Sequence, residues 1–281
     1  GHWCHCAGQF LLLPAKIQSS IRGLPWRMRC VAVGLVNVRR LSGSSRSGYP
    51  MKRVNPEDIG TIARRLEPLN TRMVFLGGAI VPLLLDNPNL IDVRHTKDID
   101  LAVEVVTRLD YSKIEEKLIA LKFSPDTSED APMCRWIIDG FKVDVMPVRD
   151  PTGKWRVRWF DVALETADTR AIDGTPCLVA PAPSFIATKM EAFADRGNDD
   201  FMGSHDMEDI VTVIDGRTSL GEEVRASSTA LRSYLVGTIK AYLEVDAFKE
   251  CLSGHLPPDA ASQQRLSGLI EKVRSIAAIR E

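Results

Sequence analysis

The sequence predicts an α/β (α+β) protein in which a lobe built on a mixed β-sheet precedes a mostly helical lobe. Short apolar segments with strand-like alternation recur between residues 73 and 148, separated by turns and a helical stretch. Beyond residue 218 the apolar residues instead recur at helical spacing. We therefore place the sheet lobe at 51–165 and the helical lobe at 166–281. The core stripe expected in the helical lobe is Leu231, Leu235, Ile239, Tyr242 and Leu243.

The bulk composition is that of an ordinary globular protein. The chain has 281 residues, of which 44% are hydrophobic and 26% are charged. That length is enough for one large domain or two modest ones. The longest apolar runs are far shorter than a membrane span, so we expect no membrane partner. The six cysteines lack paired spacing, which favours reduced thiols in a cytoplasmic protein.

The first fifty residues differ from the rest in charge. They carry seven Lys and Arg and no acid, which leaves 29 basic and 37 acidic side chains in 51–281, a net charge of −8. A net charge this negative argues against non-specific nucleic-acid binding through a broadly basic surface. A local basic groove is compatible with the same net charge. The motif HWCHC (2–6) is one compact Cys/His cluster, whereas a zinc knuckle needs two ligand pairs. We expect residues 1–50 to be vector-derived, an over-extended start or a targeting leader, without a function of their own.

Helix signals begin immediately after Met51, where we expect the folded domain to start. Asn55 suits a helix N-cap and Pro56 suits the first helical position. The apolar residues after them recur at helical spacing. They are Ile59, Ile62, Ala63 and Leu66.

A strand, two glycines and a helix are predicted next. Residues 73–76 are apolar and strand-like, Gly77 and Gly78 form a turn, and 79–86 can form a helix with Pro82 early enough to be tolerated. Glycines at such a turn let backbone N–H groups approach a ligand, and a helix N-terminus adds a partial positive charge that suits phosphate. A glycine pair is also ordinary turn chemistry, so its meaning depends on the residues later in the chain.

Two acids open the next apolar strand. Asp98 and Asp100 lie two residues apart, and residues i and i+2 of a strand point to the same face. Like charges this close repel, and burying them without a partner is costly. We therefore expect a cation beside them. Arg94 and His95, just before the pair, could touch phosphate or simply be loop residues.

A third acid is predicted on a nearby strand. Residues 134–148 are typical of a β-hairpin, with Asp139 and Gly140 as its two-residue turn. Asp144 then interrupts an apolar strand. Three converging carboxylates would hold Mg²⁺, and two metal ions could clamp the attacking and leaving oxygens of a phosphoryl transfer. The alternative is that these acids lie on edge strands and face solvent.

These motifs resemble the nucleotidyltransferase superfamily with the polymerase β-like fold. Its pattern of a hydrophobic residue and two small residues, then D-h-D, then a third Asp is matched by LGG (76–78), DID (98–100) and VDV (143–145). The block TKDIDL (96–101), at this distance from the glycines, is similar to that of the AbiEii/AbiGii-type nucleotidyltransferase toxin family. The resemblance implies a metal site at Asp98, Asp100 and Asp144. It also implies nucleotide contacts at Gly77, Gly78, Thr96 and Lys97.

A second segment, residues 181–214, resembles that family's downstream signature. There a helix carries a Lys, an Arg follows about two turns later, and D-x-x-D opens the next helix. The resemblance implies that the Lys contacts the nucleotide triphosphate, which suits a mobile point charge. His205 stands where the family usually has a basic residue before the first Asp. The four matching residues are Lys189, Arg196, Asp206 and Asp209. Of these, Lys189, Arg196 and Asp209 are expected to contact the nucleotide.

Plainer interpretations of these residues stay open. Lys189 could be a solvated helix lysine, and Asp206 and Glu208 could be favourable acids of a first helical turn. Asp209 lies further into the helix, where such an explanation fits less well. Its expected partner is Lys189 or Arg196, which share a helix face.

The expected reaction is transfer of an NMP group from an NTP to a hydroxyl acceptor, with release of pyrophosphate. Mg²⁺ or Mn²⁺ is the expected cofactor, and Asp144 could also accept the acceptor's proton. The resemblance suggests tRNA or another RNA 3′ end as acceptor, in a toxin that a cognate antitoxin protein opposes. Alternatives are a small-molecule acceptor such as an aminoglycoside, a protein hydroxyl, or an inactive nucleotide-binding module. The catalytic residues would be Asp98, Asp100, Asp144, Lys189 and Asp209.

Overall fold

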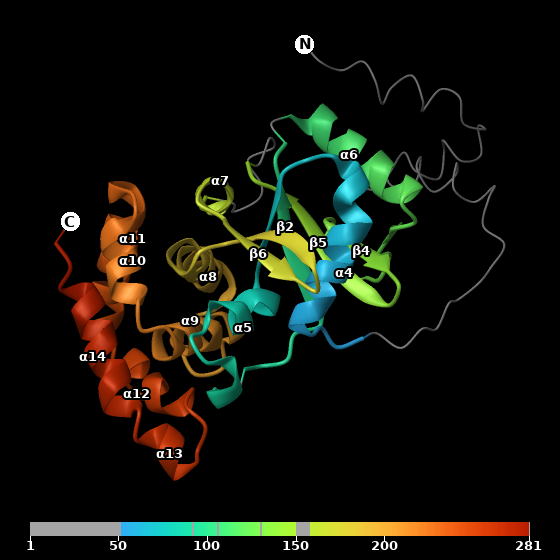
Figure 1. Ribbon diagram of the computed structural model, residues 1–281. Coiled ribbons are helices and arrows are strands. Elements are labelled where there is room, and N and C mark those ends of the chain that lie inside the picture. The colour runs from blue at the N-terminus through green and yellow to red at the C-terminus, as the bar shows by residue number, and fades with distance from the viewer. Residues whose placement is uncertain (1–51, 92, 106, 130, 150–157, 281) are drawn as a thin grey trace, which may run out of the picture. The chain divides into compact units, whose positions relative to one another are not determined.

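The computed structural model describes residues 52–91, 93–105, 107–129, 131–149 and 158–280 (Figure 1). These residues belong to one compact unit, Pro50–Glu281. The expectations for residues 1–50, including the Cys/His cluster, lie outside the described residues and stay predictions.

A seven-stranded mixed sheet forms the centre of this unit, in the order β3-β4-β5-β2-β1-β7-β6. The pairs β2–β5 and β1–β7 are parallel, and the other neighbouring pairs are antiparallel. The predicted α/β class with a mixed sheet is therefore confirmed. The strands are β1 (Met73–Leu76), β2 (Asp98–Val103), β3 (Ser124–Pro125), β4 (Arg135–Ile138), β5 (Phe141–Pro147), β6 (Asp168–Ile172) and β7 (Thr175–Val179).

Helices pack against the sheet and against one another. Helix α4 contacts β6 and β7, α7 contacts β1 and β7, and α8 and α9 contact one another. Figure 1 shows α4 in blue against the sheet and α10–α14 in orange and red at the end of the chain. The α-helices are α4 (Pro56–Leu66), α5 (Val81–Leu84), α6 (Arg108–Ala120), α7 (Phe160–Glu165), α8 (Ala182–Arg196), α9 (His205–Gly216), α10 (Leu220–Ala226), α11 (Thr229–Leu243), α12 (Asp246–Gly254), α13 (Ala260–Gln263) and α14 (Leu266–Ala277). The 3₁₀ turns are η1 (Glu67–Leu69), η2 (Gly78–Ile80) and η3 (Pro88–Leu90).

The first predicted helix is present with its predicted start. Asn55 has extended backbone angles and its N–H donates to Asp58 Oδ2 at 2.8 Å, which satisfies a backbone donor at the helix entrance. Pro56 occupies the first helical position. Ile59, Ile62 and Leu66 are buried, and the helix packs on β6 and β7. The apolar spacing predicts such a buried face.

The helix predicted over 79–86 is wrong in length and type. Residues 78–80 form a 3₁₀ turn, and only Val81–Leu84 are α-helical. The chain turns extended at Leu85, and Pro88, which begins the next 3₁₀ turn, disfavours helical geometry at the residue before it. The apolar run that predicts a helix therefore contains an α-helix of only four residues.

The sheet extends beyond the boundary expected near residue 165. Strands β6 and β7 form a hairpin within 168–179, and β7 pairs in parallel with β1. The segment 166–281 therefore contributes two strands to the sheet as well as seven helices among the described residues. The division into two lobes stays a prediction, since one sheet takes strands from both.

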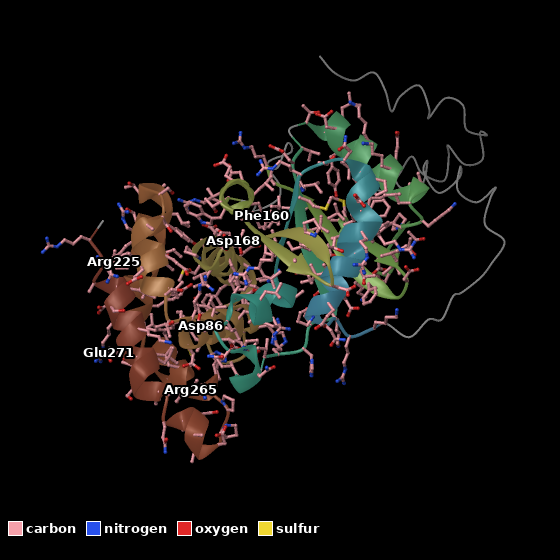
Figure 2. The ribbon with its side chains drawn as sticks, in the orientation of Figure 1. Asp86, Phe160, Asp168, Arg225, Arg265 and Glu271 are labelled. Atoms are coloured by element: carbon pink, nitrogen blue, oxygen red, sulfur yellow. The ribbon has the colours of Figure 1, made fainter. Side chains whose placement is uncertain are left out.

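The C-terminal helices pack on α8 and α9. Helix α11 contacts α8, and α14 contacts both α9 and α11. Two side chains labelled in Figure 2 attach neighbouring segments to the end of α9. Asp86 accepts hydrogen bonds from the backbone and hydroxyl of Thr218, and Arg265 Nε pairs with Asp215 Oδ2 at 3.0 Å. Among the described helices, none is both long and apolar enough to cross a membrane.

Candidate active site

Three carboxylates lie on one face of two neighbouring strands. Asp98 and Asp100 share a face of β2 because they are two residues apart. Strand β5 lies beside β2 (Figure 1) and runs parallel to it. In this register Asp144 is directly opposite Asp100. The register therefore brings the three acids together, as the sequence predicts. Asp144 is only 6% exposed, so its charge needs a partner.

That partner is Arg135. Its guanidinium donates from Nε to Asp144 Oδ1 at 2.8 Å and from Nη2 to Asp144 Oδ2 at 2.7 Å. The same Nη2 donates to Asp98 Oδ2 at 2.9 Å. The cation that the sequence requires beside the acids is thus supplied by the protein itself. Hydrogen bonding to Asp144 in turn raises the pKa of Arg135 above its ordinary value.

Asp100 has a different environment. Its carboxylate lies against the backbone of Gly77, so close that a Cβ built there would come within 1.9 Å of Asp100 Oδ2. Burial, together with the charges of Asp98 and Asp144, raises the pKa of Asp100 to about 8. The positive charge of Lys189 lowers the pKa of Asp100, but by less than burial and the two acids raise it. A divalent cation would relieve the same repulsion that keeps a proton on this group.

The glycine turn lies directly beside the acids. Gly77 has a φ of +75°, which favours glycine, and Gly78 begins the 3₁₀ turn that comes next. A Cβ at Gly78 would be 3.0 Å from Arg94 Nη2 and 3.5 Å from Asp209 Oδ2. The turn therefore lies between the carboxylates and a second group of charged residues. Because α5 has only four residues, the helix-terminus contribution to phosphate binding that we expected is not supported.

Thr96 and Lys97 differ in their placement. Thr96 is buried and its hydroxyl donates to Asp98 Oδ1 at 2.9 Å, so it helps to orient that carboxylate. Lys97 is exposed, and the ion pairs of the described residues do not include it. Its predicted contact with the nucleotide stays a prediction.

A second charged cluster connects α8, α9 and the loop before β2. The Lys189 ammonium lies 2.6 Å from Asp209 Oδ2 and 3.1 Å from Asp206 Oδ1. Arg196, on the same face of α8, makes two hydrogen bonds of 2.9 Å with Asp206. Arg94 donates to both oxygens of Asp209 at 3.2 and 3.3 Å. Of the two partners expected for Asp209, Lys189 is the one observed, while Arg196 pairs with Asp206.

The burial of this cluster excludes one of the plainer interpretations. Lys189 is 8% exposed, so it is not a solvated helix lysine. Asp206 and Glu208 do lie in the first turn of α9, and Asp206 is 5% exposed there. Burial alone disfavours the ammonium, but Asp209 and Asp206 outweigh it and raise the pKa of Lys189. Burial likewise disfavours the Asp206 carboxylate, but the Arg196 hydrogen bonds and the Lys189 charge outweigh it and lower its pKa.

The donor chemistry of the three acids fits a hard divalent cation, because Mg²⁺ and Mn²⁺ prefer carboxylate oxygens. The present side-chain positions do not form a closed ligand set. Among the described residues, no group of three or more His, Cys, Asp or Glu side chains is arranged to hold a metal ion. In these positions Arg135 donates hydrogen bonds to oxygens of both Asp98 and Asp144.

Arg135 is the site residue that the sequence reasoning missed. A signal for it exists in the hairpin turn, because a two-residue turn fixes the pairing of the strands on either side. Counting back from Asp139 and Gly140 pairs Ile138 with Phe141 and Arg135 with Asp144. Arg94, which the sequence left undecided, lies beside Gly78 and pairs with Asp209.

A cavity of about 620 Å³ is separate from this site. It lies at the start of β1 and β7, and Arg64, Arg72 and Thr175 are among its lining residues. The glycine turn lies at the opposite end of β1. None of the three acids lines the cavity, so we do not assign it to the same chemistry.

Comparisons with known proteins give distant structural likenesses only. No family model matches the chain, and no curated protein matches it. An antigenic nucleotidyltransferase-like protein from Paracoccidioides brasiliensis is similar with a TM-score of 0.44 and 20% identity, over 70% of this chain and 95% of that one. The antibiotic-resistance factor ANT(2″)-Ia is similar with a TM-score of 0.40 and 18% identity, over 66% and 93% of the two chains. Neither is described as a toxin, so the resemblance to the toxin family rests on the sequence motifs alone.

Proposed function

We propose that this chain is a divalent-metal-dependent nucleotidyltransferase that moves an NMP group from an NTP to a hydroxyl acceptor. One observation carries the proposal. Asp98, Asp100 and Asp144 converge on one face of two parallel strands, beside a glycine turn and a buried cationic cluster. Carboxylates that bind a metal, a turn open to phosphates and positive charge are the parts that phosphoryl transfer needs.

The three acids would hold Mg²⁺ or Mn²⁺. Bound there, the ion would supply stabilisation of the negative charge that develops on the phosphoryl oxygens. Asp144 would accept the proton of the acceptor hydroxyl while the hydroxyl oxygen forms a bond to the α-phosphorus. The bond from the α-phosphorus to the bridging oxygen breaks, and pyrophosphate leaves with that electron pair. Thr96 keeps Asp98 oriented through the 2.9 Å hydrogen bond.

The glycine turn and the cationic cluster would bind the triphosphate. Gly77 and Gly78 leave the backbone open to a ligand because they carry no side chain. Lys189 would neutralise phosphate charge, and Asp209 would hold both Lys189 and Arg94 in place. Arg196 would act less directly, since its guanidinium is held by Asp206.

Different features of the chain favour different acceptors. The sequence motifs favour tRNA or another RNA 3′ end, in a toxin that is opposed by an antitoxin. The net charge of −8 in residues 51–281 favours instead a cationic small molecule, such as an aminoglycoside. A nucleotide-binding module without activity is the third possibility, favoured by the engagement of two acids by Arg135.

Label transfer from each of the four α-³²P-NTPs tests the function. Each NTP is incubated with Mg²⁺ and the protein, with total tRNA, an aminoglycoside or a protein mixture as acceptor. We expect label on tRNA from one or two NTPs, and no transfer by Asp98→Ala. The control is Asp246→Ala, which removes an exposed acid that pairs with Lys249 on α12. Full activity in Asp98→Ala would contradict the metal site, and NTP binding without transfer to any acceptor would favour the inactive module.

A further inference from the structure

We propose that Arg135 is an internal counter-ion that occupies Asp98 and Asp144 until a divalent cation displaces it. The inference rests on the proposed function, because it takes the three acids to be the metal site. It adds a positioning residue for which neither the motifs nor the comparisons give a role. It also predicts that this site binds metal by exchange of one cation for another.

The hydrogen bonds of the two acids support an exchange. Both oxygens of Asp144 accept from Arg135, at 2.8 and 2.7 Å. Asp98 accepts from Arg135 at Oδ2 and from Thr96 at Oδ1, each at 2.9 Å. All four carboxylate oxygens therefore have a donor. A metal ion that took these oxygens as ligands would meet the guanidinium charge at the same place, and the two cations would repel one another.

The position of Arg135 favours a side chain that can leave. It belongs to β4, directly opposite Asp144 on β5, so the backbone holds it beside the site. Its side chain is 17% exposed, so the side chain is not sealed from solvent. Asp100 is not among its hydrogen-bond partners. Arg135 thus compensates two of the three acids, and a divalent cation would compensate all three.

The opposite role for Arg135 is also physically reasonable. A guanidinium that stayed in place could orient Asp144 for the metal, as outer-sphere partners do in many metal sites. The two roles predict opposite results when Arg135 is replaced. Loss of a competitor tightens metal binding, whereas loss of an orienting partner weakens it.

Direct Mn²⁺ binding to the full chain separates the two roles. Dissociation constants are measured by electron paramagnetic resonance of free Mn²⁺ for wild type, Arg135→Gln and Arg135→Lys. We expect Arg135→Gln to bind Mn²⁺ at least tenfold more tightly, which equals about 1.4 kcal/mol. Arg135→Lys should fall between, since lysine lacks the two-pronged geometry. Removing Asp98 as well (Asp98→Asn with Arg135→Gln) should abolish the gain.

Arg65→Gln is the matched control. Arg65 pairs with Asp139 at 2.7 Å in the turn of the same hairpin, where both side chains are about half exposed. Its replacement removes an Arg–Asp pair near the site without freeing any of the three acids. The Mn²⁺ affinity of this variant should equal that of wild type. Circular dichroism shows whether each variant folds. If Arg135→Gln does not fold, the Mn²⁺ dissociation constants of Arg135→Lys and wild type test the counter-ion role.

Each outcome separates this inference from the proposed function. If wild type binds Mn²⁺ and both Arg135 variants bind it equally or more weakly, the counter-ion role is wrong while the metal site stands. If no variant binds Mn²⁺, with or without a non-hydrolysable NTP analogue, both the counter-ion role and the proposed function are wrong. Tighter binding in Arg135→Gln supports the exchange even if no acceptor has been identified.

Discussion

The site depends most sharply on the conformation of one residue, Gly77. Its φ of +75° lies in the region that side chains rarely adopt, and Asp100 Oδ2 fills the space of a Cβ. Gly78 differs in both respects, since its φ is not positive and the nearest atom to a Cβ is the end of the flexible Arg94 side chain. Position 77 therefore requires glycine for its backbone conformation and for the close approach of Asp100, whereas position 78 requires it for neither reason.

Alanine at each glycine tests this difference. We expect Gly77→Ala to lose about 1–3 kcal/mol from the backbone conformation, with a further loss from displacement of Asp100. Gly78→Ala should change the free energy of unfolding much less. Urea denaturation measures both free energies of unfolding. NTP binding should fall in both variants, because each adds a methyl group to the turn, and it should fall further in Gly77→Ala. Equal effects of the two substitutions would show that the close approach of Asp100 to Gly77 is not a constraint.

At the scale of elements, helices α8 and α9 bring charge to the glycine turn from distant sequence. Lys189 on α8 and Asp209 on α9 form the 2.6 Å pair, and Asp209 also holds Arg94 of the loop before β2. The pair is buried, so its two charges depend on one another. The two helices contact one another directly, and their packing positions the cationic cluster.

Asp209→Asn should separate stability from nucleotide binding, with Asp215→Asn as the control. Asp215 is also a buried acid of α9 in an ion pair, but its partner is Arg265. Breaking a buried pair typically costs about 3–5 kcal/mol, so both variants should unfold at lower urea concentration. Only Asp209→Asn should weaken NTP binding, by at least tenfold in calorimetry. A similar weakening in Asp215→Asn would mean that the effect follows from lost stability.

At the scale of the whole molecule, the protonation of Asp100 couples the site to global stability. Its pKa is about 8 in the folded protein, against an ordinary value of 3.8. Between pH 3.8 and about pH 8 the Asp100 carboxyl holds a proton in the folded state and has released it in the unfolded state. Stability from this group is therefore fully present below pH 3.8 and is lost as the pH rises through 8.

The unfolding free energy of the metal-free protein, measured in EDTA from pH 5 to pH 8, tests this coupling. One proton corresponds to a slope of about 1.4 kcal/mol per pH unit at most. We expect wild type to lose stability with rising pH relative to Asp100→Asn, which cannot titrate. Asp246→Asn, at an exposed acid on α12, should remain parallel to wild type. Parallel curves for wild type and Asp100→Asn would show that Asp100 titrates normally.

The local elements of the site could be predicted from the sequence because their causes are local. Strand alternation places Asp98 and Asp100 on one face, and the Asp139–Gly140 turn defines the hairpin that carries Asp144. The N-cap of the first helix results from short-range hydrogen bonds. Local rules did not determine the length of α5, where extended and 3₁₀ geometry replaced the expected helix.

The assembly of the site was decided only by the tertiary structure. That β2 and β5 are parallel neighbours, with α6, β3 and β4 between them in the chain, depends on long-range packing. The same is true of β6 and β7 joining the sheet and of Asp209 reaching Gly78. The sequence by itself predicted a compensating cation beside Asp98 and Asp100, since two carboxylates this close repel one another. Only the fold decided that Arg135 supplies it, because strand pairing places this guanidinium opposite Asp144 and within reach of Asp98.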